Sequence, residues 1–342
     1  MLKSQFVRFW HIGLYLLKEG QALFGFLMGF VHSRDQIVVR WDAPAKLPGR
    51  RFAVFVHFDR NGRVNDFVLD YVRALRDAAC EVIFVTNAGT LQPAALVALQ
   101  PLCRTVIVRR NVGYDFAAMR DGLAAVPVGP DALDFVLIAN DSVYGPFTPL
   151  APVLARMDFS KADVWGATES WQRRYHLQSF FLAAGPAALG SKAWREFWDK
   201  LRPVRSKHWI VTRYEVGLTQ ALVRAGLRCQ ALWGYEELAS DVDVSLLGAD
   251  DTVVDPFQNV RRIQTGRIRY ATVARRPLNP TAELWRQLLV RDFPFIKREL
   301  LRDNPAGISD IVDWRDVLRR QFGTDTAPIE ADLRRVLKNK SP

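Results

Sequence analysis

The sequence predicts an α/β fold with a mostly parallel central sheet and flanking helices. Short apolar runs rich in β-branched residues have the pattern of strands that are buried on both faces. These runs span residues 51–59, 81–87, 105–108 and 135–139. Segments with helical spacing alternate with them, at residues 64–79, 92–100 and 114–125. This alternation predicts parallel strands joined by right-handed crossover connections.

Beyond these elements the alternation continues less regularly. Residues 162–170 and 176–184 are typical of two further strands. A helix is predicted from residue 214 to Gly226, and a strand follows at residues 229–233.

The tripeptide Asn140-Asp141-Ser142 closes the apolar run 135–139 and stands just before Gly145-Pro146. A strand that ends in a carboxylate places it at the carboxyl edge of the sheet, where open α/β folds bind their ligands. The alternative is that the three residues only form a turn.

A second motif, Arg109-Arg110-Asn111-Val112-Gly113-Tyr114-Asp115-Phe116, follows the strand at 105–108. Asn and Gly predict a turn, and the predicted helix begins directly after it. Backbone N–H groups and two arginines would therefore meet at a helix start, which is a place for an anion.

The two motifs together resemble the signature of the rhamnan synthesis protein F family of glycosyltransferases. That signature reads Arg-Asn-x-Gly-Tyr-Asp-Phe, followed by a strand that ends Asn-Asp-Ser-x-Tyr-Gly-Pro, and the similarity extends from about Phe52 to about Pro305. The resemblance implies a nucleotide-diphospho-sugar transferase (GT-A-like) fold. It also implies that Asp141 holds a divalent metal, Mg²⁺ or Mn²⁺, against the diphosphate of a nucleotide-sugar donor.

Candidate donor-binding residues lie at the strand ends and in the turn. His57, Asp59 and Asn87 each close a predicted strand and are candidates for contacts with the base and ribose. The turn adds Arg110, Asn111, Gly113 and Asp115. The alternative for the strand-end residues is that they cap strands or stabilise turns.

Glu169, His176 and Gln178 are candidates for the acceptor and sugar pocket. They lie in segments similar to the family's Gly-x-Thr and His-Leu-Gln-Ser stretches, and the resemblance implies their role. For His176, the alternative is a loop histidine that caps a strand.

Glu215 is the candidate general base, because it lies in the first turn of the predicted helix 214–226. Many glycosyltransferases of this fold carry their catalytic carboxylate at such a helix start, and an inverting displacement needs a base for the acceptor hydroxyl. The alternative is that the acid only complements the helix dipole.

The C-terminal part, from Asn279-Pro280-Thr281 to Pro305, resembles the family's end. A histidine commonly follows Asn-Pro-Thr in the family, but this chain has Ala282 there, which puts a second protein ligand for the metal in doubt. Lys297 and Arg298 either face the donor phosphates or form the polar face of a helix.

The net charge of +11 and pI of about 9.8 suit phosphorylated substrates and anionic membrane surfaces. No nucleic-acid-binding motif accompanies the basic residues, so nucleic acid is not an expected partner. Cys80, Cys103 and Cys229 lack metal-ligand spacing and are expected to be reduced, which favours the cytoplasm.

The first 35 residues contain two apolar stretches, each shorter than the ~20 residues that a spanning helix needs. They form either a helix that lies in the membrane interface or one that docks on the protein. The expected location is therefore peripheral, at the inner face of the cell membrane.

The predicted organisation is an amphipathic segment (1–35), a catalytic domain (50–245) and a C-terminal extension (246–342) that packs on or completes it. The predicted function is transfer of a sugar, rhamnose or a related deoxysugar, from a nucleotide-diphosphate donor to a cell-surface polysaccharide, with a lipid-linked acceptor. The alternative is a catalytically silent glycan-binding or assembly subunit of the same fold.

Overall fold

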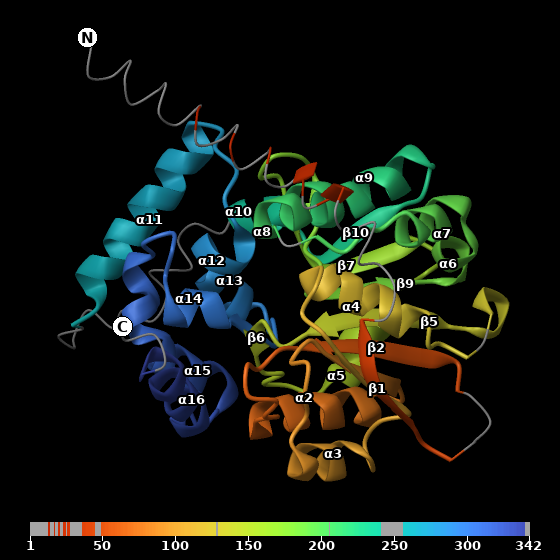
Figure 1. Ribbon diagram of the computed structural model, residues 1–342. Coiled ribbons are helices and arrows are strands. Elements are labelled where there is room, and N and C mark those ends of the chain that lie inside the picture. The colour runs from red at the N-terminus through yellow and green to blue at the C-terminus, as the bar shows by residue number, and fades with distance from the viewer. Residues whose placement is uncertain are drawn as a thin grey trace.

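The computed structural model describes residues 36–44, 49–127, 129–204, 206–240 and 256–338, with the isolated positions 13, 17, 20, 23, 24, 26 and 27 before them (Figure 1). The predicted segment 1–35 as a whole and the predicted boundary at 245/246 therefore lie outside the described residues. Among the described residues, no helix combines the length and the hydropathy needed to cross a membrane.

A mixed, mostly parallel sheet forms the centre of the fold. Its strands run in the order β1 (Ile37–Asp42), β4 (Thr105–Arg109), β3 (Glu81–Thr86), β2 (Arg51–His57), β5 (Phe135–Asn140), β9 (Phe181–Ala184), β7 (Val164–Ser170) and β10 (Cys229–Trp233). The four neighbours from β4 to β5 are parallel, as are β7 and β10, whereas β9 is antiparallel to both β5 and β7. The predicted α/β class with a mostly parallel sheet and flanking helices is confirmed.

Two parts of the sheet differ from the sequence prediction. The edge strand β1 was not predicted; it pairs antiparallel with β4, and Val38 and Val39 are about half exposed there. Because successive residues of β1 point to opposite faces and Ile37 to Arg40 are all exposed, this edge strand lacks the pattern of a fully buried strand. The predicted strand at 176–184 is two strands, because β8 (His176–Leu177) pairs with β7 before β9 begins.

The central strands are buried on both faces, and alternate residues contribute to separate cores. In β2, Ala53 and Phe55 pack in one apolar cluster with α2 (Asp66–Asp77), whereas Phe52, Val54 and Val56 pack in a second cluster with α4 (Tyr114–Leu123). Figure 1 shows α2 and α4 on opposite sides of the sheet. The first face is also covered by α3 (Pro93–Leu99) and α5 (Leu150–Ala155), and the second by α6 (Pro186–Gly190), α7 (Lys192–Asp199) and α9 (Val216–Arg224).

The helical run that contains Glu215 begins earlier than predicted. Ser206 caps it, since its Oγ accepts a hydrogen bond from the backbone N–H of Trp209 at 3.2 Å. The run starts as α8 (Lys207–Trp209), continues as a π-helix labelled η2 (Ile210–Glu215) and ends as α9. π-helical turns are rare and occur often at functional sites.

Residues 256–338 form helices that pack against the end of the sheet. They comprise α11 (Gln258–Val273), α12 (Pro280–Glu283), α13 (Trp285–Val290), α14 (Arg298–Arg302), η4 (Ser309–Asp313), α15 (Trp314–Phe322) and α16 (Ala327–Lys338). They follow α10 (Tyr235–Ser240). A third apolar cluster joins α13, α14, η4, α15 and α16 to Tyr144 of β6 (Val143–Tyr144), whereas Ile268 and Ala271 of α11 belong to the first cluster. The short strand β11 (Ile296–Lys297) pairs antiparallel with β6, which opposes Lys297 to Val143.

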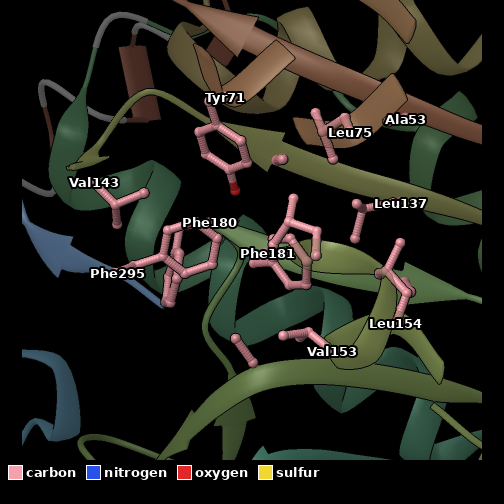
Figure 2. Packing of buried hydrophobic residues seen from close by; sticks show 14 of the residues in the cluster. Ala53, Tyr71, Leu75, Leu137, Val143, Val153, Leu154, Phe180, Phe181 and Phe295 are labelled. Atoms are coloured by element: carbon pink, nitrogen blue, oxygen red, sulfur yellow. The ribbon is translucent and has the colours of Figure 1, made fainter. Parts of the chain in front are cut away.

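Phe295 anchors the chain just before β11. Its ring lies 5.2 Å from that of Tyr71 and 5.4 Å from that of Phe181 (Figure 2). Such aromatic packing fixes the direction of the chain, and Lys297 is therefore placed by the main core rather than by a surface helix.

Candidate functional site

A cavity of about 1090 Å³ opens at the carboxyl ends of the parallel strands. This is the edge where open α/β sheets bind ligands, and the volume lies slightly above the ~300–1,000 Å³ range of ligand pockets. Its lining includes Asp59, Asp115, Asn140, Asp141, Ser142, His176, Gln178, Ser179, Phe180, Glu215, Asn279, Thr281, Lys297 and Arg298. The residues come from both the sheet domain and the C-terminal elements.

Asp141 lies where predicted, directly after β5. Its Oδ2 accepts hydrogen bonds from the backbone N–H of Phe58 at 3.4 Å and from Nη1 of Arg298 at 3.3 Å. Burial raises the pKa of Asp141 to about 6, although the Arg298 guanidinium opposes this shift. The carboxylate is thus positioned from two sides and faces the cavity.

Asp115 lies across from Asp141 in the same cavity. Asn140 donates from Nδ2 to Oδ2 of Asp115 at 3.3 Å, which links the strand-end tripeptide to the start of α4. Burial and then the neighbouring Asp141 carboxylate raise the pKa of Asp115 to about 6. Two carboxylates with shifted pKa values in one cavity are typical of a functional site.

Glu215 also reaches the cavity, at the end of the π-helix. Its Oε1 accepts from both the backbone N–H of Ser179, at 3.1 Å, and the Ser179 Oγ, at 2.9 Å. Because the helical run begins at Lys207, Glu215 does not lie in a first helical turn, and the helix-dipole alternative loses its basis.

Of the three candidates for the sugar and acceptor pocket, two line the cavity and one does not. Gln178 lines the cavity and donates from Nε2 to Asn279 and Thr281, each at 3.3 Å. His176 lines it as well, and its Nδ1 lies 2.8 Å from the main-chain oxygen of Arg174. Glu169 does not line it, because its Oε1 accepts from the backbone N–H of Tyr235 at 3.0 Å.

Of the predicted donor-binding residues, Asp59 and Asp115 line the cavity. The remaining five do not line it: His57, Asn87, Arg110, Asn111 and Gly113. Gly113 serves the backbone instead, because it adopts a φ of +85° and a Cβ there would lie 2.8 Å from the Cα of Pro203.

Arg109, one of the two arginines of the predicted anion site at the turn, is engaged within the protein. Arg109 is fully buried and donates to Oδ2 of Asp121 at 2.8 Å, to the main-chain oxygen of Val112 at 3.0 Å and to Oδ1 of Asn87. These bonds engage the Arg109 guanidinium and the Asn87 carbonyl. The pair therefore joins β3, β4 and α4 rather than facing the cavity.

His57 is buried beneath the strand end, with its Nδ1 3.1 Å from Thr86 Oγ1. Burial lowers its pKa from 6.5 to about 4. Since the unfolded chain binds the proton more tightly, the stability contributed by neutral His57 is complete above pH 6.5 and is lost as the pH falls toward 4.

We expect the contribution of neutral His57 to the free energy of unfolding to fall by roughly 3 kcal/mol between pH 6.5 and pH 4. Denaturant unfolding at pH 7 and pH 4.5 measures it, and His57→Asn should flatten the pH dependence by most of that amount. His176→Gln is the matched control and should keep the wild-type pH dependence. Equal slopes for wild type and His57→Asn would refute this expectation.

The fit of a divalent metal depends on the ligands that the cavity offers. The described residues contain no cluster of three His, Cys, Asp or Glu side chains arranged to hold a metal ion. Asp141 and Asp115 reach the cavity, and Mg²⁺ is often held by one or two carboxylates together with substrate phosphates and water. These carboxylates fit a metal that arrives with a diphosphate, rather than a closed metal site.

The sequence prediction missed part of the site in the C-terminal helices. Nη2 of Arg298 donates to Oδ2 of Asp332 in α16 at 3.0 Å, and the Tyr144 hydroxyl donates to the same oxygen at 2.7 Å. Arg335 donates to Asp332 at 2.7 Å and to Asp59 at 3.3 Å. Residues of α16 thus position Arg298 against Asp141, and no local motif around Asp332 signals this role.

Among known proteins, the chain is similar to a virulence protein. Virulence protein VirA of Vibrio anguillarum (strain ATCC 68554 / 775) is 31% identical over 213 residues, which cover 61% of this chain and 66% of VirA. The chain therefore aligns with slightly less than two thirds of that relative.

Two solved glycosyltransferases are similar to this chain at low TM-scores. GlyE of Streptococcus pneumoniae TIGR4 has a TM-score of 0.34 and 11% identity, covering 61% of this chain and 51% of its own. A mannosyltransferase of Pyrobaculum calidifontis, in complex with GDP-Man and Mn²⁺, has a TM-score of 0.33 and 15% identity, covering 96% and 90%.

The model of the family described as rhamnan synthesis protein F matches residues 82–273. This range holds both sequence motifs, Asp115 and Asp141 included, as well as Glu215. Since the match spans more than half of the 342 residues, the chain belongs to the rhamnan synthesis protein F family.

Proposed function

We propose that this protein is a glycosyltransferase that moves a sugar from a nucleotide-diphosphate donor to a polysaccharide acceptor. The observation that carries the proposal is the meeting of Asp141, Asp115 and Glu215 in one cavity at the carboxyl edge of the sheet. Such a cavity offers both a place for a diphosphate and a carboxylate that can accept a proton. Membership in the family supports the same activity.

In this proposal the donor diphosphate lies beside Asp141 and Asp115. A divalent metal bound there with the donor would neutralise the diphosphate as it departs. Arg298 fixes the orientation of Asp141 through two contacts, with its carboxylate and with its main-chain oxygen at 3.0 Å. The nucleoside extends toward Asp59 at the end of β2.

Glu215 acts as the general base on the acceptor hydroxyl, as an inverting displacement requires. Ser179 binds only Oε1 of Glu215 among the described contacts, which leaves Oε2 for the acceptor. Gln178 and His176, which line the same cavity, contact the sugars.

The donor sugar is rhamnose or a related deoxysugar, and the acceptor is lipid-linked at the inner face of the membrane. The net charge of +11 supports contact with an anionic surface. At the N-terminal end, Phe26 stacks on Trp209 with ring centroids 5.0 Å apart, whereas Leu23, Phe24 and Leu27 are more than half exposed. In this proposal Phe26 docks on the protein and its exposed neighbours face the membrane.

A thermal-shift screen of nucleotide sugars with and without Mn²⁺ tests the proposal, because a ligand that binds the native state raises its stability. At a ligand concentration of about 100 Kd the expected stabilisation is roughly 2.7 kcal/mol. At least one nucleotide-diphosphate sugar should raise the melting temperature, and the matching nucleoside should do so less. A melting temperature that no nucleotide sugar changes would contradict the donor site and favour a silent glycan-binding subunit.

A further inference from the structure

Lys297 enters the cavity from the pairing of β11 with β6. Residues two apart along an extended segment point to the same side, so Lys297 follows the side on which Phe295 packs. The Phe180 ring confirms this placement, since its centroid lies 6.4 Å from the Phe295 ring and 4.0 Å from the Lys297 Nζ. The ammonium group is therefore held at a fixed position in the cavity wall.

The Lys297 ammonium has more donors than the protein uses. An ammonium carries three N–H donors, and Lys297 makes one hydrogen bond to a described residue, to Ser142 Oγ at 3.0 Å. Within the described part of the chain Lys297 forms no ion pair within 4.0 Å, although the carboxylates of Glu215, Glu299 and Asp115 are near enough to raise its pKa. Burial lowers the pKa of Lys297 to about 8, which leaves the group mostly charged at pH 7.

Neighbouring cations in the cavity are engaged differently. Arg298 is bound to Asp141 and Asp332, and its guanidinium lies 4.9 Å from the centre of the Phe67 ring. Lys207 is paired with Glu299 at 3.4 Å, and its side chain is 77% exposed. A cation withdrawn from water, with donors left over and facing a cavity, is suited to an anionic ligand.

We propose that Lys297 binds the diphosphate of the nucleotide-sugar donor, with Ser142 fixing the direction of its ammonium. This inference rests on the proposed function. As the bond from the sugar carbon to the diphosphate oxygen breaks, the electron pair stays on that oxygen, and Lys297 stabilises the added charge. The acceptor oxygen forms the new bond to the sugar carbon, and its proton passes to Glu215.

If Lys297 binds the diphosphate, removing its charge should weaken binding of a nucleoside diphosphate more than binding of a nucleoside monophosphate. Lys297→Met keeps the length of the side chain and removes its charge, so the nucleoside diphosphate should bind about 10- to 100-fold more weakly, the scale of a hydrogen bond to a charged group. The nucleoside monophosphate should lose no more than about threefold. Lys297→Arg should restore most of the preference for the diphosphate, because it keeps a cation there.

Lys207→Met is the matched control, since it removes the same charge from the same cavity at an exposed position. Titration calorimetry of the full chain with UDP, GDP and dTDP and the three monophosphates, in EDTA and again in Mn²⁺, gives the affinities. Circular dichroism confirms that each variant is folded. The control should stay within about threefold of wild type, since exposed charges are screened by solvent.

The results distinguish a failure of the Lys297 assignment from a failure of the proposed donor site. If wild type binds the diphosphates and Lys297→Met binds them equally well, or loses diphosphate and monophosphate alike, the assignment of Lys297 is wrong and the donor site stands. If Lys207→Met weakens binding as much as Lys297→Met does, Lys297 contributes only to the overall positive charge of the cavity, and its assignment is wrong as well. If wild type binds none of the six nucleotides in either condition, the proposed donor site fails and this inference fails with it.

Discussion

Replacing Asp141 with alanine should reduce sugar transfer by at least about 10²–10³-fold while the protein stays folded, the scale of losing one preorganised electrostatic contact in an active site. The carboxylate orients Arg298, faces Asp115 and supplies the oxygen ligands expected for a donor-bound metal. Its removal leaves the Arg298 guanidinium with Asp332 as its remaining carboxylate partner among the described contacts. Turnover and circular dichroism on the same preparation measure the effect.

Asp134→Ala is the matched control, because Asp134 precedes β5 at the opposite end from Asp141. It forms surface ion pairs with Arg50 at 2.8 Å and Arg51 at 3.1 Å, and exposed pairs contribute little. Asp134→Ala should therefore keep wild-type turnover. Near-normal turnover and metal dependence in Asp141→Ala would show that the diphosphate lies elsewhere.

Glu215→Gln should reduce turnover by about two to four orders of magnitude, the usual range for a general base, while donor affinity changes little. The amide oxygen of glutamine can still accept both hydrogen bonds from Ser179, so the local fold has no reason to change. The kcat and the donor Kd, measured on one preparation, distinguish the loss of a base from the loss of a binding contact.

Unchanged turnover in Glu215→Gln would assign proton transfer to another carboxylate. Asp115 would be the first to test, because it lines the same cavity, whereas Glu169 is bound to the backbone N–H of Tyr235. A loss of donor affinity in place of turnover would make Glu215 a binding residue.

The sequence predicted the parallel part of the sheet because its signals are local. The runs 51–59 and 81–87 became Arg51–His57 and Glu81–Thr86, since strands buried on both faces are apolar along their whole length. The position of Asp141 followed from the same signal, because a strand end and a Gly-Pro break are read directly from neighbouring residues.

The part of the site that the C-terminal elements contribute could not be predicted from neighbouring residues. The pairing of Lys297 with Val143 joins two-residue strands about 150 residues apart, and strands this short have no periodicity. Asp332 acts through Arg298 across an even longer separation from Asp141, so its role appears only once α16 is placed. Local motifs also do not tell which way an arginine points, and Arg109 turned inward to Asp121.

The start of the helical run at Lys207 has a comparable cause. A sequence window marks helix positions by a period of 3.6 residues, but the π-helix Ile210–Glu215 shifts that period. Ile210, Val211 and Glu215 all line the cavity, so the irregular turn is the one that carries the candidate base.

Transfer itself tests the central claim most directly. The full chain is incubated with a panel of nucleotide-diphosphate sugars, dTDP-rhamnose included, and with a detergent extract of bacterial lipid-linked glycans as acceptor, while ³¹P NMR follows release of the nucleoside diphosphate. We predict acceptor-dependent release from at least one donor, lost in Asp141→Ala and Glu215→Gln and kept in Asp134→Ala. Binding of a donor without release of nucleoside diphosphate from any member of the panel would contradict the account. It would identify a protein that retains the donor site but does not catalyse transfer.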